Sequence, residues 1–451
     1  MLQGFRSKSK RHAADLAFCR RRTTVTDSKP PRTEEARDFA FYVGIDWASA
    51  KHDLCVVDAG GRLVQQQSLE HGTGTIDDWV GELVRRADGR PVAIILEQTR
   101  GALIYALMNR ENVCLFPINP QQFAAYRKSF NNVDAKDDKV EARLLARFLF
   151  ERHRDLRRWE PADEPTRLLG QLAEARRAAV DDRTRFCVQL RDLLTKYYPQ
   201  LLTLAATQLH ECGALLAIVC KWSDPKELSR ARRCDIVRVL REHGAGKSNV
   251  ETLAEQLRTA PLHCRDKVIA RVCAMRAHAL AKHVQLANRT VAEYDEALKE
   301  AVAKHPDHDL FAGVKGLGKA LLPRVIAAFG SDRDRFGDAQ EVANFSGTSP
   351  VCRQSGKMRV VVRRRACNQH LKQTFHELAN ATSKWTRWAK AYYRYQRDRG
   401  LKHHAALRKL ARCWIRILYR VWKDRVAYDD ARYERALLLK TPGLAKYLPA
   451  A

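Results

Sequence analysis

Short apolar runs separated by polar turns dominate the chain from about residue 40 to residue 155. The run from Phe41 to Asp46 ends on an acid, and the run from Pro91 to Glu97 repeats that pattern. Runs of this length that are bounded by turn residues are typical of strands. The pattern predicts strands over residues 41–46, 52–57, 62–67, 91–96 and 113–117, with helices near 76–84 and 101–110.

The order of these elements indicates the fold class. Asp58-Ala-Gly-Gly61 is a good hairpin turn, so the first three strands are expected to be antiparallel. Helices and strands then alternate along the chain. This order is the one expected of an RNase H-like α/β domain.

The hydrophobic period changes beyond Pro165, where the sequence becomes almost wholly helical. Apolar positions there step by four and three residues, which is an a/d heptad seam. The seam predicts a coiled-coil hairpin or a dimer contact, although an amphipathic helix in a bundle explains it nearly as well. Its members are Leu280, Val284, Ala287, Val291, Tyr294, Leu298 and Ala301.

Shifts in composition divide the chain into five parts. Residues 1–38 mix basic residues with Ser, Thr and Pro and are predicted to be a disordered arm. The other predicted parts are an α/β catalytic domain at 39–155, a helical and coiled-coil region at 156–305, a small helical C-terminal domain at 306–433 and a tail at 434–451.

The formal net charge of +29 favours a nucleic-acid partner, because a polyanion is its simplest complement. Ribosomal, chromatin and membrane-surface proteins can carry a similar excess of positive charge. No apolar run approaches the roughly 20 residues of a membrane span, and Arg20 to Arg22 interrupt any signal-peptide core. The twelve cysteines contain no CxxC pair that would indicate zinc. We expect a cytoplasmic protein with no membrane partner.

Asp46 and Glu97 end two predicted core strands. An unpaired buried carboxylate is costly, so acids at such positions suggest a partner or ligand, and the ends of strands converge at one sheet edge. Asp138 and Glu141 share one face if their segment is helical. Other acids nearby, Asp53, Asp58 and Asp137, are expected to be turn or surface residues.

Three or four carboxylates at one place would bind Mg²⁺ or Mn²⁺. Two such ions about 3.5–4 Å apart can support an in-line phosphodiester displacement. From spacing alone, capping or salt-bridged surface acids are an equally good explanation.

A glycine-rich segment runs from Gly313 through Gly316 and Gly318 to Lys319. A P-loop is excluded because Ala320 has no hydroxyl group and no apolar strand precedes the segment. A turn between two short helices fits better, and its amides can hold a backbone phosphate as in helix-hairpin-helix proteins. A tight turn without a ligand is the simpler alternative.

Ser355 lies between polar residues and beside a glycine, so it can be exposed on a turn. Nearby cations could hold a phosphate and stabilise a leaving alkoxide. The residues alone favour an ordinary turn serine. The cations are Lys357, Arg359, Arg363, Arg364 and Arg365.

Aromatic residues between Phe375 and Trp422 alternate with Arg, Lys and His. Such mixing suits nucleic-acid contacts through stacking and charge. Some of these rings must instead fill the core of the small domain.

Together these segments resemble the DEDD transposases of insertion sequences, which are bridge-RNA-guided serine recombinases. The resemblance extends from about Phe41 to Trp388. Several ordered motifs at family-like spacing are more specific than any single one. The motifs are Val43-Gly-Ile-Asp46, the strand ending at Glu97, Lys136 to Ala146, the glycine turn ahead of Phe336, and Ser346-Gly-Thr-Ser-Pro350 leading to Gln354-Ser355-Gly-Lys357.

The resemblance implies a RuvC-like N-terminal domain, a helical and coiled-coil middle and a C-terminal transposase domain. It implies that Asp46, Glu97 and Asp138 bind the metal. The family has Asp at the fourth position, where this chain has Glu141, so we expect retained binding with altered geometry. Ser355 falls on the family's nucleophilic serine.

The resemblance also implies partners: donor and target DNA, a structured guide RNA, and a homo-oligomer (dimer or tetramer) in which the carboxylates of one subunit meet the serine of another. Two rival hypotheses remain. A metal-dependent junction-resolving nuclease would use the acids and not Ser355. An inactive nucleic-acid-binding relative would use neither, and Glu141 is the residue that favours it.

Overall fold

The computed structural model describes residues 39–448, except residues 49, 73, 98–100, 131–137, 206–207, 245–248 and 357. The predicted basic arm at residues 1–38 lies outside this part of the chain. The chain forms two compact units, the first ending at Pro161 and the second beginning at Ala162.

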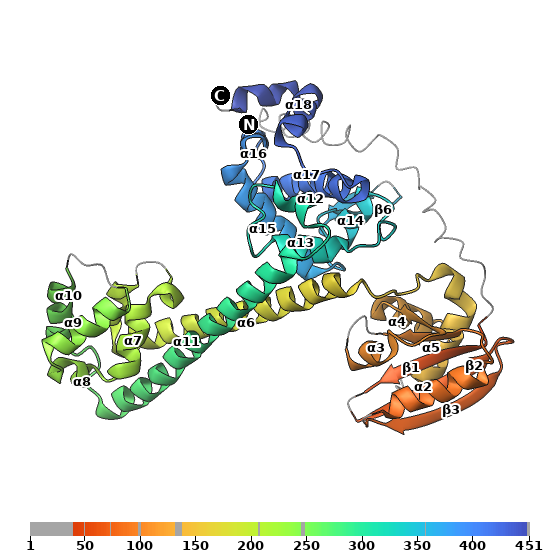
Figure 1. Cartoon of the computed structure of the whole chain (residues 1–451), viewed down its shortest axis with the longest axis horizontal. Coiled ribbons are helices and arrows are strands. Elements are labelled where there is room, and N and C mark those ends of the chain that lie inside the picture. The colour runs from red at the N-terminus through yellow and green to blue at the C-terminus, as the bar shows by residue number, and fades with distance from the viewer. Residues whose placement is uncertain are drawn as a thin grey trace, which may run out of the picture. The chain divides into compact units, whose positions relative to one another are not determined.

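The first unit contains a mixed five-stranded sheet in the order β3-β2-β1-β4-β5 (Figure 1). The pairs β1–β2 and β2–β3 are antiparallel, whereas β1–β4 and β4–β5 are parallel. The mixed α/β domain is confirmed, and its RNase H-like assignment stays a prediction. The elements are β1 (Phe41–Trp47), β2 (Lys51–Asp58), β3 (Leu63–Glu70), α2 (Thr75–Arg86), β4 (Val92–Leu96), α3 (Ala102–Leu107), β5 (Val113–Pro117), α4 (Pro120–Lys128), α5 (Asp138–Arg152) and the 3-10 turn η1 (His153–Asp155).

The predicted hairpin turn joins β2 to β3. The Oδ1 atom of Asp58 accepts hydrogen bonds from the amides of Gly60 at 2.8 Å and Arg62 at 2.9 Å. Gly61 adopts φ 78°, which favours glycine. Asp58 is therefore the turn acid that the sequence predicts.

Helices cover both faces of the sheet, because successive side chains of a strand point to opposite faces. Val43 and Ile45 of β1 pack in a core with residues of α2 and α3. Tyr42 belongs to the other core, which α5 covers.

Gly44 lets α5 pack directly on β1. A Cβ at this position would overlap the carbonyl oxygen of Ala142 and the amide nitrogen of Ala146, and would lie 2.8 Å from the Cβ of Leu145. Because two of these neighbours are helix backbone, no side-chain rotation can make room. Gly44 therefore sets how closely α5 approaches the sheet.

We predict that Gly44→Ala destabilises the chain by about 1–3 kcal/mol, the usual effect of overpacking a core. Urea denaturation followed by tryptophan fluorescence measures it. Gly81→Ala is the matched control, because its Cβ would meet only the flexible end of Arg110, at 3.1 Å, and alanine favours helix α2. Equal stability of Gly44→Ala and wild type would show that α5 does not rest on this glycine.

The second unit is helical apart from one small hairpin, within the residues that the structure describes. None of the described helices combines the length and the apolar character needed to cross a membrane. Its elements are α6 (Glu164–Tyr197), η2 (Pro199–Leu204), η3 (Leu209–Glu211), α7 (Gly213–Lys221), α8 (Pro225–Arg230), α9 (Arg233–Glu242), α10 (Val250–Thr259), α11 (Lys267–Ala303), α12 (His308–Ala312), α13 (Leu322–Phe329), α14 (Ala339–Phe345), β6 (Val351–Ser355), β7 (Met358–Val362), α15 (Gln369–Trp385), α16 (Arg387–Asp398), α17 (His403–Asp424), α18 (Asp430–Lys440) and η4 (Pro442–Tyr447).

The long helices α6 and α11 pack against each other (Figure 1). The predicted seam lies on α11, where Leu280, Val284 and Leu298 are buried and Tyr294 is half-buried. The seam is thus covered within the chain, as a helical hairpin requires. Coiled-coil geometry for the pair stays a prediction.

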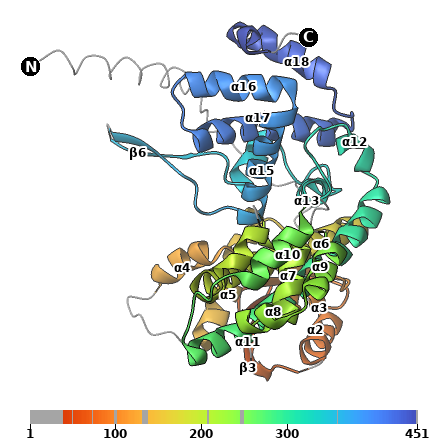
Figure 2. The same cartoon turned by 90° about the vertical axis from the view of Figure 1, so that its left-hand side faces the viewer.

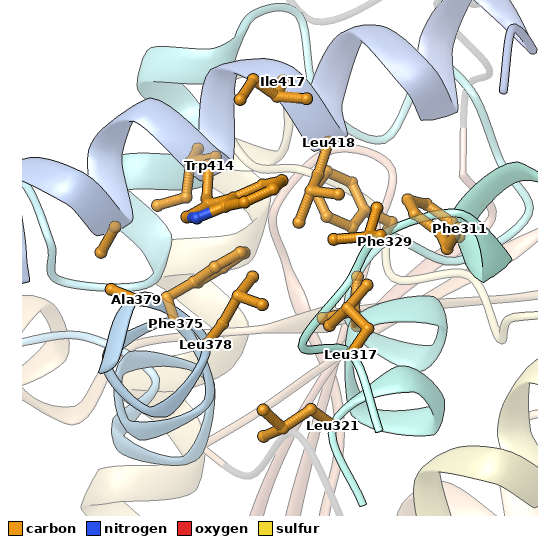
Figure 3. Packing of buried hydrophobic residues seen from close by; sticks show 14 of the residues in the cluster. Phe311, Leu317, Leu321, Phe329, Phe375, Leu378, Ala379, Trp414, Ile417 and Leu418 are labelled. Carbon is orange, nitrogen blue, oxygen red and sulfur yellow. The ribbon is translucent and has the colours of Figure 1, made fainter. Parts of the chain in front are cut away.

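One apolar core joins the C-terminal helices to the near ends of the long helices. Figure 3 shows its C-terminal part, where Phe329, Phe375 and Trp414 pack together. Leu169 of α6 and Leu298 of α11 belong to it. Trp388, Trp414 and Trp422 are fully buried there, which confirms that part of the aromatic stretch fills a core.

Asp295 of α11 ties the long helices to the glycine turn. Its Oδ1 atom accepts a hydrogen bond from Nε of Arg176 in α6 at 2.5 Å, and Nζ of Lys319 lies 3.3 Å from its Oδ2. Burial acts to raise the pKa of the Asp295 carboxyl, but the two cations outweigh it and leave that pKa below its ordinary value.

We predict that Asp295→Asn lowers the free energy of unfolding at pH 7 by about 1.5–3 kcal/mol, the range for hydrogen bonds to charged groups. Because the folded carboxyl has a lowered pKa, its stabilisation is complete above its ordinary value of 3.8 and is lost as the pH falls through the lowered value. Urea denaturation of both proteins between pH 7 and pH 3 should show the difference shrinking in acid. A difference independent of pH would contradict this account.

Candidate active site

Two acids end neighbouring strands at the same edge of the sheet. β1 and β4 run parallel, with Gly44 beside Ile95. Continuing that register places Asp46 beside Glu97, on the face opposite to Ile45. Both acids are half-buried. The structure therefore sets side by side the two strand-end acids that the sequence singles out.

Helix α5 adds the other two predicted acids. Asp138 is its first described residue and Glu141 lies three positions on, so both fall on one face. One carboxylate oxygen from each of Asp46, Asp138 and Glu141 lies within 4.8 Å of the others. Asp138 is exposed and Glu141 is buried, so the trio extends inward from the surface of the domain.

Glu97 and Asp46 line the same cavity. The cavity holds about 180 Å³, room for roughly six waters at about 30 Å³ each. Among the described residues, the close trio does not include Glu97. The cavity is lined by Ile45, Asp46, Trp47, Leu96, Glu97, Leu103 and Pro120.

Arg127 of α4 forms an ion pair with Glu141 through Nη1 and Oε1. No motif in the sequence marks this arginine. Its positive charge offsets part of the repulsion among acids that lie within a few ångströms of one another. The side chain of Arg127 is 40% exposed, so it can turn away when another cation is present.

The donor set fits a hard divalent cation. All the converging atoms are carboxylate oxygens, the ligands that Mg²⁺ and Mn²⁺ prefer, and neither histidine nor cysteine belongs to the trio. The arrangement thus suits the metal that the sequence predicts, and the metal's identity stays a prediction.

The structure corrects the expectation that Asp53 is a turn or surface acid. Asp53 lies inside β2, only 6% exposed, directly opposite Asp46 on the neighbouring strand. The hydroxyl of Ser68 donates a hydrogen bond to its Oδ1. Its period-two spacing with the buried Cys55 and Val57 is the signal that places it on the α5 face. Asp137, grouped with it in the sequence, lies outside the described residues.

Ser355 lies at the end of β6, in a hairpin that the sequence analysis did not predict. It pairs with Met358 of β7, and the turn between them contains Gly356 at φ 53°. The hairpin extends away from the neighbouring helices, and Ser355 is exposed (Figure 2). The structure thus confirms that Ser355 is exposed beside a turn. Ser355 belongs to the second unit and the carboxylates to the first.

Polar contacts hold the base of this hairpin. Arg364, just after β7, donates hydrogen bonds to the Ser349 carbonyl at 3.4 Å and to Oδ1 of Asn344 at 3.2 Å. Gln340 of α14 donates to the Ser349 hydroxyl at 2.7 Å. Arg364, predicted to bind nucleic acid, therefore also has a structural contact.

The other predicted nucleic-acid-binding residues lie in two places. Arg359, Arg363 and Arg365 are exposed on or beside the hairpin, and Lys357 lies outside the described residues.

Gly316, Gly318 and Lys319 form the turn between α12 and α13. A helix and not a strand precedes this turn, so the exclusion of a P-loop is confirmed. Gly316 adopts φ 105°, and a Cβ there would lie 2.8 Å from Cγ2 of Thr382.

Two family profiles match the chain. One is described as a transposase, of the DEDD type found in IS110 elements, and matches residues 43–199. The other is described as the transposase IS116/IS110/IS902 family and matches residues 308–394. The first range contains the four predicted acids and the second contains Ser355.

Similar proteins span nearly the same length. The chain is 28% identical over 410 residues to the "Mini-circle putative transposase for IS117" of Streptomyces coelicolor, which covers 88% of this chain and 97% of the relative. It is 25% identical over 406 residues to the uncharacterized 44.8 kDa protein of insertion element IS116 from Streptomyces clavuligerus, covering 86% and 96%. It is 23% identical over 399 residues to the uncharacterized 42 kDa protein of IS900 from Mycobacterium paratuberculosis, covering 86% and 97%.

These matches, together with the carboxylate cluster, define an enzyme that cuts and rejoins DNA, a transposase. The chain belongs to the IS110/IS116 family of insertion-element transposases.

We predict that Asp46→Asn removes the stabilisation of the chain by a divalent cation. In 5–10 mM MnCl₂, a range on the order of a hundred times a Kd of ~0.1 mM, wild type should gain about 2–3 kcal/mol and the variant little. Thermal unfolding measures both.

Asp78→Asn, an exposed acid of α2, is the matched control and should respond to metal as wild type does. An equal response of Asp46→Asn would show that Asp46 does not hold the ion.

Proposed function

We propose that this transposase recombines DNA through a covalent serine–DNA intermediate, with a divalent cation at the carboxylates and a structured RNA guiding the choice of sites. The observation that carries the proposal is the convergence of Asp46, Asp138 and Glu141 within 4.8 Å, beside the cavity that Glu97 shares. A bound Mg²⁺ or Mn²⁺ would supply Lewis-acid stabilisation of phosphate oxygens there.

The chemistry assigned to Ser355 is a pair of transesterifications. Its Oγ loses a proton and bonds to a DNA phosphorus, while the bond from phosphorus to the departing strand's oxygen breaks and that oxygen takes up a proton. A strand-end hydroxyl later attacks the same phosphorus and returns the serine. Because each step makes one phosphodiester-type bond and breaks one, no nucleotide energy source is required.

The placement of Ser355 supports this role. Its side chain is exposed near the tip of a hairpin whose base is held by Arg364 and Gln340, so it can reach a phosphate outside the domain. Arg359 and Arg363 are exposed on and beside the same hairpin, and their positive charges would offset the charge of that phosphate.

The proposed partners follow from charge and family resemblance. A chain of net charge +29 can hold donor DNA, target DNA and a guide RNA while releasing their counterions. We propose that a dimer or tetramer brings the serine of one subunit to the carboxylates of another. Cutting would then depend on assembly.

We predict that Ser355→Ala abolishes a covalent protein–DNA adduct. The assay is a denaturing gel after incubation of the full chain with donor and target DNA, the RNA encoded beside the element, and Mg²⁺. Asp46→Ala should also abolish the adduct, because the cation site is lost. An RNA requirement for wild-type adducts would support guidance.

Two variants serve as controls. Ser229→Ala removes an exposed serine elsewhere in the unit and should leave the adduct unchanged, as should Asp78→Asn. Cleaved DNA ends without any adduct in wild type would overturn the serine mechanism in favour of a hydrolytic nuclease. Bound but uncut nucleic acid under all conditions would indicate an inactive relative and direct attention to Glu141.

A further inference from the structure

Trp385 differs from the other tryptophans of the C-terminal domain. Its side chain is 76% exposed, whereas Trp388, Trp414 and Trp422 are fully buried in the core. It is the last residue of α15, and α16 begins two residues later. Leaving an indole ring in water forgoes the burial that stabilises its neighbours, so the ring offers a large flat surface to a partner.

The glycine turn lies against the junction of α15 and α16. The hydroxyl of Thr386 donates a hydrogen bond to the Lys315 carbonyl at 3.2 Å. Gly316 packs so closely on Thr382 that any side chain would meet its methyl group. These contacts place the turn and Trp385 on neighbouring parts of one surface.

Three exposed cations lie on the segments next to Trp385. Lys384, Lys315 and Arg387 are exposed, and they belong to α15, the glycine turn and α16. One of them, Arg387, has an acid nearby: Oε1 of Glu434 in α18 lies 3.7 Å from its Nε. The immediate chain neighbours of Trp385, Lys384 and Thr386, are polar.

We propose that Trp385 stacks on an unpaired nucleobase, while Lys384 and Lys315 contact the phosphates on either side of it. An aromatic ring among cations is the arrangement that binds single-stranded nucleic acid, because every base has a face to stack and every nucleotide carries a charge. Bases inside a duplex already stack on each other, so the site selects looped, flipped or single-stranded nucleotides. The inference rests on the proposed nucleic-acid chemistry, and adds a site to it.

Charge argues against a second copy of the chain as the occupant. A symmetric contact centred on Trp385 would bring Lys384 and Lys315 of both copies together. Like charges at an interface oppose association, whereas a polyanion neutralises them.

The test compares the full chain with Trp385→Ala and Trp385→Phe, using 12-nucleotide single strands of oligothymidine, oligouridine and an abasic strand of equal charge. Stacking predicts that Trp385→Ala weakens binding to the base-containing strands about tenfold and leaves the abasic strand unchanged. Trp385→Phe, which keeps a ring, should retain most of the affinity. Lys384→Ala should weaken all strands alike and reduce the dependence on salt.

A photocross-linking arm locates the contact. An oligonucleotide that contains 5-iodouracil should cross-link to Trp385 in wild type, as mass spectrometry of the peptides would show. The comparison of oligothymidine with oligouridine tells whether DNA or RNA is the preferred source of the base.

Four results would overturn the inference. Equal loss of base-containing and abasic binding would mean that Trp385 acts through charge or folding and not through stacking. Unchanged binding by Trp385→Ala would remove the site while leaving the proposed recombination intact. If Trp385→Ala lost a self-association that wild type shows in sedimentation, Trp385 would lie in a contact between copies of the chain. Absence of oligonucleotide binding by wild type would also overturn it, whereas the adduct assay tests the proposed function separately.

Discussion

The close contact between α5 and β1 is the constraint on which the candidate site depends. Gly44 has no side chain, so the backbone of α5 rests on the strand, two residues from Asp46. That contact fixes the start of α5 beside the sheet edge and brings Asp138 and Glu141 to Asp46. A larger residue would separate the acids by displacing the helix, even with every acid still present.

Electrostatics shape the two candidate sites in opposite ways. The sheet edge concentrates acids in a chain with a large positive surplus, and Asp53, opposite Asp46, adds to their mutual repulsion. Arg127, paired with Glu141, offsets part of this repulsion. Clustered acids repel one another and lower the stability of the fold, as is common at functional sites. A bound cation removes that repulsion. The hairpin of Ser355 carries arginines instead, which suits phosphate binding and cannot attract a metal.

The sequence predicted the strands well, because their apolar runs are short and sharply bounded. It also placed Asp46 and Glu97 at one sheet edge, since the strand ends of a parallel pair share an edge. The family resemblance, and not the spacing, added Asp138 and Glu141 to them. The sequence prediction failed at Asp53, where an acid near the start of a buried strand resembled a turn acid. It missed the β6–β7 hairpin, where Met358, Val360 and Val361 are exposed and apolar and polar positions do not alternate as in a strand with one buried face. It could not single out Trp385, because composition does not distinguish an exposed ring from the buried Trp388 three positions on.

The most direct test of the central claim is anomalous diffraction from crystals of the full chain with DNA and Mn²⁺. The account predicts an ion within about 2.0–2.5 Å of oxygens of Asp46 and Asp138, with Glu141 turned toward it and Glu97 at the same cavity. Density for the ion elsewhere, with Glu141 still paired to Arg127, would contradict the claim that α5 and β1 together build the metal site.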